Sequence, residues 1–204
     1  MLLIEAKGKE LLATVGIAIP KGWFVQSLED LKSLDIEFPI AIKAQVASVG
    51  RGKSGGVQKC LNLPEAEAAF ESIMKLRFSG EFALGVLIEP WLPIVREIYL
   101  SVAMDGRAGG FVVLYSPTGG VEIEKLGPAV RYPIGLARNF RAHELRKLLE
   151  KIESDHKLRE HIVMLARRIL QLAQAYDCLT VEINPLVQLS DGTILAGDAK
   201  VVRD

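Results

Sequence analysis

The sequence predicts an α+β fold. Two hairpins of apolar strands, one from Arg96 to Ser116 and one from Leu179 to Val202, are typical of antiparallel sheet. A long helical stretch separates them, and short helices and strands precede them in no regular order. Because a doubly wound parallel sheet needs strands and helices that alternate, the sequence favours mixed or antiparallel sheets instead.

The first sixty residues predict short elements that glycine and proline interrupt. A helix is expected from Glu5 to Val15, ended by Gly16, and a short strand from Trp23 to Val25. A second short helix is expected from Leu28 to Leu34. The β-rich run from Pro39 to Val46 then predicts the first long strand.

A stronger helix signal follows Asn62 and Pro64. The first turn carries Glu65 and Glu67, as the helix dipole favours, and apolar residues recur at helical spacing as far as Met74. This pattern predicts an amphipathic helix that packs on a sheet.

The remaining chain predicts strands and one long helical region. Strands are expected from Phe82 to Pro90, Arg96 to Gly106 and Gly110 to Ser116, and helix from Ala142 to Ala175. The tight turn at Ser190 to Gly192 joins the strands of the last hairpin. One buried helix face is indicated by residues that step by four and three, namely Leu158, Ile162, Leu165, Ile169, Leu172 and Tyr176.

Composition excludes several function classes. Lys+Arg and Asp+Glu both number 25 in the 204 residues, so zero net charge argues against general nucleic-acid binding. No apolar run approaches the ~20 residues of a membrane helix. Glu5 and Lys7 stand where a signal peptide would be apolar. Cys60 and Cys178 lack metal-ligand spacing and suggest a reducing compartment, so we expect the cytoplasm, or the mitochondrial matrix in a eukaryote.

The stretch "GRGKSGGV", from Gly50 to Val57, follows the first long strand. It is not a Walker loop, since Ala47 stands where that motif needs its first glycine. Glycines with the cations Arg51 and Lys53 are suited to close over phosphates through N–H groups and charge. A plain surface turn is the alternative.

Lys43 places a cation inside that apolar strand. Burying an ammonium without a partner is costly, so Lys43 requires an anionic partner or a route to solvent. A position shortly before the glycine loop makes it a candidate phosphate ligand. An exposed strand face is the alternative.

The last hairpin carries Glu182, Asn184 and Asp198 on strands that a short turn joins. Two carboxylates with an amide are oxygen ligands that Mg²⁺ accepts, with water and phosphate completing the octahedron. A polar ladder along a hairpin edge is the alternative.

Glu89 and Glu97 flank the turn "PWLPIVR", where a carboxylate can hold ribose hydroxyls and strand-end backbone can pair with adenine. These residues predict a nucleotide–Mg²⁺ site without an evident nucleophile.

Four blocks in order resemble the ATP-grasp domain of succinyl-CoA synthetase β subunits. They are "IKAQVASVGRGKSGGV" (42–57), "LIEPWLPIVREIYLSV" (87–102), "SPTGGVEIE" (116–124) and "VEINPLVQLSDGTILAGDAK" (181–200). ATP-citrate lyases and malate-CoA ligases are related. The resemblance covers essentially the whole chain.

This resemblance implies a role for each matching residue. The implied contacts to nucleotide phosphates are Lys43, Gly50, Arg51 and Gly52. The backbone of Glu89 and Leu92 would meet the adenine edge, and Glu97 would bind the ribose. The implied Mg²⁺ ligands are Asn184 and Asp198. The implied lobes are a smaller one at roughly 20–95, which clasps the nucleotide, and a larger one at 1–19 and 96–204, which carries the metal.

In this family ATP or GTP, bound together with Mg²⁺, phosphorylates a histidine on a CoA-binding α subunit. The phosphoryl group then passes to a carboxylic acid, and CoA displaces the phosphoryl group from this acyl phosphate. The resemblance thus implies a nucleophile supplied by a partner, and CoA as a substrate of the full enzyme but not a ligand of this chain alone. The family continues after "DAK" at 198–200 into a flavodoxin-like domain that these residues lack.

Three departures from the family pattern qualify the choice of acid. Val49 replaces a glycine, Thr118 replaces an acidic residue, and Gly106 replaces an arginine. The alternatives are the ATP-grasp part of a citrate-, malate- or acetate-CoA ligase, and a non-catalytic assembly module that keeps the fold. The ADP-forming acetyl-CoA synthetases usually have histidine near the glycine loop, and this chain has none there.

Overall fold

The computed structural model describes residues 1–47, 55–120 and 129–204. Two compact units make up this part of the chain. Unit 1 consists of Met1, Gly8–Ile19 and Ile94–Asp204, and unit 2 consists of Leu2–Lys7 and Pro20–Pro93. Helix α1 (Glu5–Thr14) is divided between them. Unit 2 thus includes the start of α1, which the sequence reasoning had grouped with the larger lobe.

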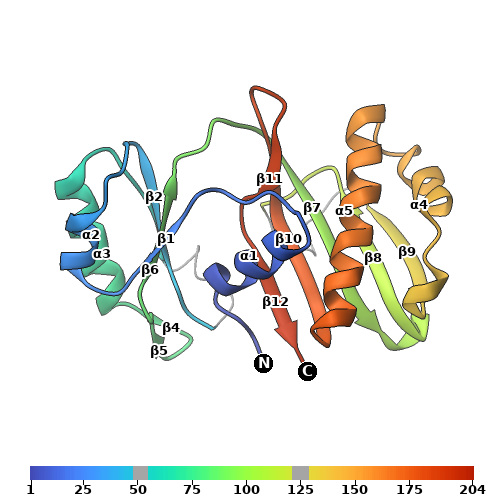
Figure 1. Ribbon diagram of the computed structural model, residues 1–204, viewed down its shortest axis with the longest axis horizontal. Helices are drawn as coiled ribbons and strands as arrows, with labels where there is room; N and C mark the ends of the chain where they lie inside the picture. Colours follow the sequence, from blue (N-terminus) through green and yellow to red (C-terminus); the bar gives the residue numbers. More distant parts are fainter. Residues whose placement is uncertain (48–54, 121–128) are drawn as a thin grey trace. The chain divides into compact units, whose positions relative to one another are not determined.

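Unit 2 is built on an antiparallel sheet with the strand order β1-β6-β2-β3 (Figure 1). Helices α2 and α3 pack on one face of this sheet, and a two-stranded ribbon of β4 and β5 adjoins them in the chain. The bounds are β1 Trp23–Val25, α2 Leu28–Ser33, β2 Ile40–Ala44, β3 Val57–Cys60, α3 Leu63–Lys75, β4 Arg77–Phe78, β5 Glu81–Phe82 and β6 Val86–Pro90.

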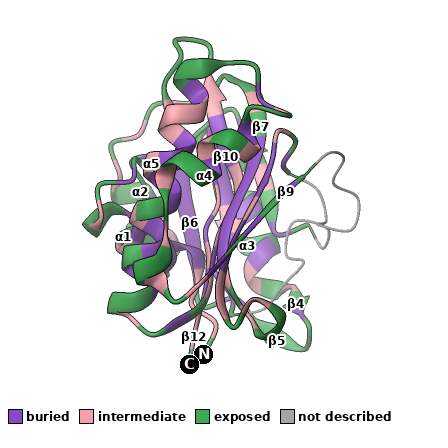
Figure 2. Cartoon of the chain, turned by 90° about the vertical axis from the view of Figure 1, so that its right-hand side faces the viewer, coloured by how far each residue is buried: buried purple, intermediate pink, exposed green. Residues whose placement is uncertain are grey.

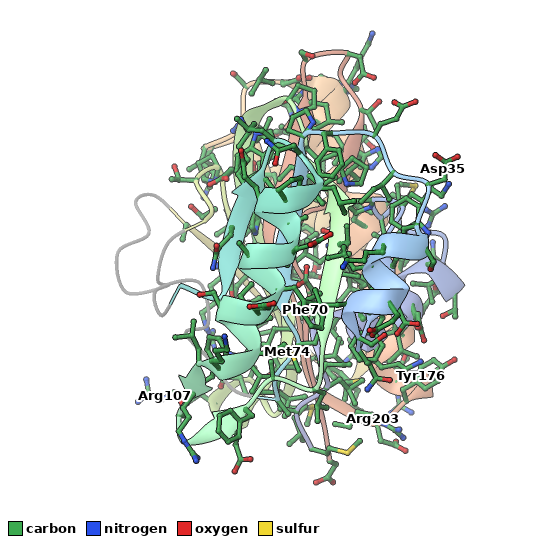
Figure 3. All side chains as sticks on the ribbon, turned by 90° about the vertical axis from the view of Figure 1, so that its left-hand side faces the viewer. Asp35, Phe70, Met74, Arg107, Tyr176 and Arg203 are labelled. Atoms are coloured by element: carbon green, nitrogen blue, oxygen red, sulfur yellow. The ribbon has the colours of Figure 1, made fainter. Side chains whose placement is uncertain are left out.

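Helix α3 begins where the sequence predicts. The Asn62 side chain accepts a hydrogen bond from Glu65 N–H at 3.0 Å, and Glu65 accepts one from Leu61 N–H at 2.8 Å. This reciprocal pair satisfies N–H groups that a helix start leaves without partners in the helix. Figure 3 shows Phe70 and Met74 one turn apart on α3, and both pack in the core of unit 2.

Every second residue along strand β2 contributes its side chain to that core. Ile40, Ile42 and Ala44 of β2 lie in the apolar cluster with α2 and α3, together with Ile88 of β6. Because successive side chains of a strand point to opposite faces, Lys43 points to the other face of the sheet. We call this face of unit 2, which carries Ala41, Lys43, Leu87 and Glu89, the polar face.

Unit 1 is built on a six-stranded antiparallel sheet with the order β11-β10-β7-β8-β9, in which β12 also pairs with β10. Helices α4 and α5 pack against it, and the middle of β7, from Ile98 to Val102, is buried (Figures 1 and 2). The bounds are β7 Ile94–Asp105, β8 Gly110–Ser116, β9 Val130–Gly135, α4 Ala142–Leu149, α5 His156–Ala175, β10 Cys178–Leu189, β11 Ile194–Ala196 and β12 Lys200–Arg203. Among the described residues no helix is both long and apolar enough to cross a membrane.

Both predicted hairpins are confirmed. β7 pairs antiparallel with β8, and β10 pairs antiparallel with β11 and β12. The single helical stretch predicted from Ala142 to Ala175 is wrong, because α4 ends at Leu149 and α5 begins at His156. Asp155 explains the break: its side chain caps α5 by accepting from Lys157 and Leu158 N–H groups.

Candidate functional site

The sheet of unit 1 has a helix-covered face and a second face. Arg96 and Tyr115 reach Glu153, which lies in the connection between α4 and α5. Alternation along β7 therefore turns Glu97, Tyr99 and Ser101 to the second face. We call this the polar face of unit 1.

Two strands contribute hydrogen-bonded side chains to the polar face of unit 1. Glu182 of β10 is the cross-strand partner of Ser101, so it lies on the same face. The Tyr99 hydroxyl contacts Ser101 Oγ at 3.0 Å and Glu182 Oε2 at 3.4 Å. Burial raises the pKa of Tyr99, so its hydroxyl stays protonated and able to donate. Glu182 is therefore part of a polar network that begins inside the sheet.

Asn184 and Asp198 stand opposite each other on the last hairpin. The ladder of β10 with β12 includes the pair Glu182–Lys200, and the ladder with β11 includes Leu186–Ala196. Both ladders have one register, which places Asn184 opposite Asp198 in the interval between them. On the side of β7 the register of β10 shifts in the same interval. Such irregularities re-aim side chains and often adjoin functional sites.

Backbone hydrogen bonds shape this interval. Gly197 N–H donates to the Pro185 carbonyl at 2.9 Å, and Asp198 N–H contacts the same oxygen at 3.3 Å. A side chain at position 197 would approach Pro185 O at 3.0 Å and Val187 at 2.9 Å, so it would have to displace these neighbours. Asp198 Oδ1 accepts from Ala199 N–H at 2.6 Å, which fixes the carboxylate close to the strand.

The paired glycines 119 and 120 lie directly on this site. Gly119 N–H donates to the Glu97 carbonyl at 2.9 Å, and Gly120 N–H donates to Asn184 Oδ1 at 2.7 Å. A methyl group at position 119 would lie 2.5 Å from the Ile98 backbone, and one at 120 would meet the Glu97 carboxylate. The glycine turn therefore brings Glu97 of β7 and Asn184 of β10 to one place.

The donor chemistry of this site fits Mg²⁺. Asn184 and Asp198 supply an amide and a carboxylate oxygen at opposing positions. In the described ranges no group of three or more His, Cys, Asp or Glu side chains is arranged to hold a metal by itself. Mg²⁺ characteristically takes one or two protein carboxylates and completes its shell with water and phosphate oxygens. Two protein ligands thus suit a metal that arrives with a nucleotide.

In unit 2 the polar face carries the lysine that the sequence singles out. Lys43 Nζ lies 2.6 Å from Glu89 Oε2 and 3.1 Å from Glu5 Oε1. The exposed fractions of the three side chains are 13% for Lys43, 3% for Glu89 and 1% for Glu5. The anionic partners that Lys43 requires are therefore carboxylates of the chain itself, and the alternative of an exposed strand face is wrong.

The other candidate residues of unit 2 are only partly described. The carboxylate of Glu89 contacts Lys43. Leu92 is half-buried and follows Trp91, whose N–H donates to the Pro39 carbonyl at 2.9 Å. Gly50, Arg51 and Gly52 lie outside the described residues, as does Val49.

Comparison with known proteins decides the family. A family model described as an ATP-grasp domain matches residues 2–188. The chain belongs to the ATP-grasp family. The predicted α+β ATP-grasp fold with antiparallel sheets is confirmed.

Curated relatives match along the whole of this ATP-grasp chain. It is 32% identical to the β subunit of succinate–CoA ligase (ADP-forming) from Methanothermobacter thermautotrophicus over 211 residues. It is 33% identical to the β subunit of succinate–CoA ligase (GDP-forming) from Thermus thermophilus over 214 residues. The chain spans 57% and 56% of the lengths of these relatives. The predicted resemblance to succinyl-CoA synthetase β subunits is therefore confirmed for the part that the chain covers.

Solved structures share the fold. The dinucleotide-forming acetyl-coenzyme A synthetase 1 of Ca. Korarchaeum cryptofilum, in complex with coenzyme A, Ca-AMPCP and HgCl+, matches with a TM-score of 0.82 and 19% identity. That match covers 100% of this chain and 93% of the other. ATP citrate lyase from Methanothrix soehngenii matches with a TM-score of 0.73 and 19% identity, over 98% of this chain and 50% of the other.

Sequence reasoning missed two charged residues of this ATP-grasp domain, both on α1. Glu5 contacts Lys43, and Lys9, which is 2% exposed, donates from Nζ to the Gly197 carbonyl at 2.9 Å. The available signal was spacing: Glu5, Lys9 and Leu12 step by four and three, which is the spacing of a buried helix stripe. Charges at those positions indicate buried partners.

Proposed function

We propose that this chain is the nucleotide-binding part of an NDP-forming acyl-CoA ligase of the succinate–CoA ligase type. The observation that carries the proposal is the match of the whole chain to β subunits of ADP-forming and GDP-forming succinate–CoA ligases. The chain spans little more than half of those subunits, so the complete ligase requires further parts. We propose the cytoplasm, or the matrix of a mitochondrion, as the compartment.

The proposed roles are given residue by residue. Lys43, with Gly50, Arg51 and Gly52, would contact the phosphates, and backbone groups of Glu89 and Leu92 would meet the adenine edge. Glu97 would bind the ribose. Asn184 and Asp198 would hold Mg²⁺, whose bound charge would neutralise charge that develops on the transferred phosphoryl group.

The proposed reaction transfers the terminal phosphoryl group of the nucleotide to a histidine of a CoA-binding α subunit. The bond between that phosphorus and the bridging oxygen breaks, a bond to an imidazole nitrogen forms, and the nucleoside diphosphate leaves. The chain then contributes position and charge, which is how proteins generally promote phosphoryl transfer. CoA and the carboxylic acid would be substrates of the complete enzyme.

The first test is calorimetric titration with Mg–ATP, Mg–GTP and each nucleotide without metal. We expect wild-type protein to bind the Mg²⁺ complex more tightly than the free nucleotide, and Asp198→Ala to lose that difference. Asp191→Ala is the matched control, because Asp191 lies in the exposed turn of the same hairpin. If the folded wild-type chain binds neither nucleotide, the proposed function is wrong. Equal losses with and without metal in Asp198→Ala would remove the metal role.

The second test adds a CoA-binding α subunit of a succinate–CoA ligase and ATP labelled in the terminal phosphate. We expect acid-labile label on the α subunit, as phosphohistidine predicts. Formation of a stable complex without label would favour an assembly module that keeps the fold and lacks turnover.

A further inference from the structure

A buried carboxylate on the helix-covered face of unit 1 has no role in the site described so far. Glu153 is 2% exposed. Its Oε2 accepts a hydrogen bond from Arg96 Nη2 at 2.6 Å, and its Oε1 accepts one from Arg96 Nη1 at 3.3 Å. The Tyr115 hydroxyl donates to Glu153 Oε2 at 2.6 Å, and Asp155 N–H donates to Oε1 at 3.1 Å. Arg159 donates to the Glu153 carbonyl at 2.7 Å.

The carboxylate of this network is ionised. Burial by itself would raise the pKa of Glu153, but hydrogen bonds from Arg96 and Tyr115 outweigh burial, and the pKa lies below its usual value. A paired and fully hydrogen-bonded buried charge gives little net stability compared with an apolar group of the same volume. Its geometric consequence is clearer, because a two-pronged pair fixes the guanidinium plane.

The network reaches the polar face through the backbone. Arg96 precedes Glu97 on β7, so the two side chains point to opposite faces of one stretch of backbone. Arg96 Nε also donates to the Pro117 carbonyl at 3.4 Å. Pro117 begins the turn that ends in the paired glycines, and Thr118 N–H donates to the buried Ser116 hydroxyl at 3.2 Å.

The turn closes back on the same strand. Gly119 N–H donates to the carbonyl of Glu97, and Gly120 N–H to Asn184, as described above. Both the start of the turn, at Pro117, and its end are therefore tied to Arg96–Glu97.

We propose that Glu153 and Tyr115, acting through Arg96, are positioning residues that aim the Glu97 carboxylate and the glycine turn at the nucleotide. The inference rests on the proposed function, in which Glu97 binds the ribose. None of the three network residues touches the nucleotide in this scheme. Their effect is a selective one, on recognition of the ribose hydroxyls.

The test compares the dissociation constants of ATP and of 2′,3′-dideoxy-ATP, both with Mg²⁺. For the wild type we expect a preference for ATP of roughly ten- to a hundredfold, the range of a hydrogen bond to a charged group. In Glu153→Gln we expect this preference to fall by about threefold or more, since small displacements of a ligand group cost large factors. Tyr115→Phe removes one hydroxyl and keeps the packing, so it should show a smaller fall in the same direction.

A matched control is available on the same helices. Glu160 accepts from Arg146 at 2.5 Å and 2.8 Å in a similar two-pronged pair, which joins α5 to α4. Glu160→Gln should leave the preference for ATP unchanged. The midpoint temperature of thermal unfolding is measured for each variant in parallel. It distinguishes loss of the folded state from a changed orientation of the Glu97 carboxylate.

Each outcome decides something different. A folded wild type that binds no ATP contradicts the proposed function, and the inference falls with it. A wild type that prefers ATP, with variants that keep the preference while their thermal midpoints fall, shows a purely structural network and overturns the inference alone. Equal binding of both nucleotides by the wild type removes the ribose role of Glu97 and likewise overturns it.

Discussion

Replacing Lys43 by methionine removes the ammonium that Glu89 and Glu5 contact inside unit 2. The two carboxylates are 3% and 1% exposed, so solvent compensates little for the lost charge. Loss of one partner from a buried ion pair costs about 3–5 kcal/mol, because the remaining charge keeps its desolvation penalty. Methionine matches the length of the lysine stem, so little of the loss should come from a cavity. We therefore expect Lys43→Met to lower the free energy of unfolding of unit 2 by about 3–5 kcal/mol.

The assay is urea unfolding followed by tryptophan fluorescence. The chain has two tryptophans, Trp23 and Trp91, and both belong to unit 2, so the signal reports on the unit that is perturbed. Glu89→Gln and the double variant complete a double-mutant cycle with Lys43→Met. We expect a coupling energy of about 2–3 kcal/mol, because the neutral glutamine tolerates the loss of the ammonium.

A surface lysine of the same unit is the control. The Lys75 side chain is 77% exposed and lies 3.6 Å from Glu71 one helical turn away. Lys75→Met should change stability by no more than about 0.5 kcal/mol. Our reasoning about Lys43 is refuted if Lys43→Met costs less than about 1 kcal/mol, or if the cycle is additive within about 0.5 kcal/mol.

Two further predictions concern unit 1. Gly119→Ala should cost about 1–3 kcal/mol and weaken nucleotide binding, because its methyl group would lie 2.5 Å from the Ile98 backbone, whereas Gly106→Ala meets nothing within 4 Å and should be nearly neutral. Thermal unfolding and titration of both variants check this. The second concerns acid: the pKa of Glu153 is lowered from 4.5, so its carboxylate stabilises the fold above pH 4.5 and loses that effect as pH falls through the lower folded value. The stability difference between wild type and Glu153→Gln should therefore shrink below pH 4.5, and a difference that grows there would contradict the assigned direction.

Local signals made most of the fold predictable. The hairpins and α3 follow from turn residues, caps and periodicity that lie within a few residues of each other. The break between α4 and α5 has a weak sequence signal, because Asp155 caps a helix start without any glycine or proline beside it. β9 contains Pro133 and lies at the edge of its sheet, where proline is tolerated, so its sequence does not resemble a central strand.

The candidate site was less predictable because its geometry depends on register between distant segments. The sequence indicates that Lys43 needs an anion, but only the pairing of β2 with β6 brings Glu89 beside it, and only the fold of the chain start brings Glu5. Similarly, the sequence places Asn184 and Asp198 on one hairpin. Their opposition follows from two ladders that keep one register on both sides of these residues.

The same alternation explains where the polar residues of both units lie. In β2 the residues 40, 42 and 44 fill an apolar core while Lys43 points away from it, and in β7 the residue Arg96 points to the helices while Glu97 points away. In β2 the charged residue thus lies on the face opposite α2 and α3, whereas β7 carries one charged residue on each face. In β7 the inference goes further, because the charge on the helix-covered side is itself paired and buried. If the ribose test shows that Glu153 controls Glu97 through that strand, adjacent charges on opposite faces of a strand form a single positioning unit. A search for functional residues should then include the neighbour that points into the core.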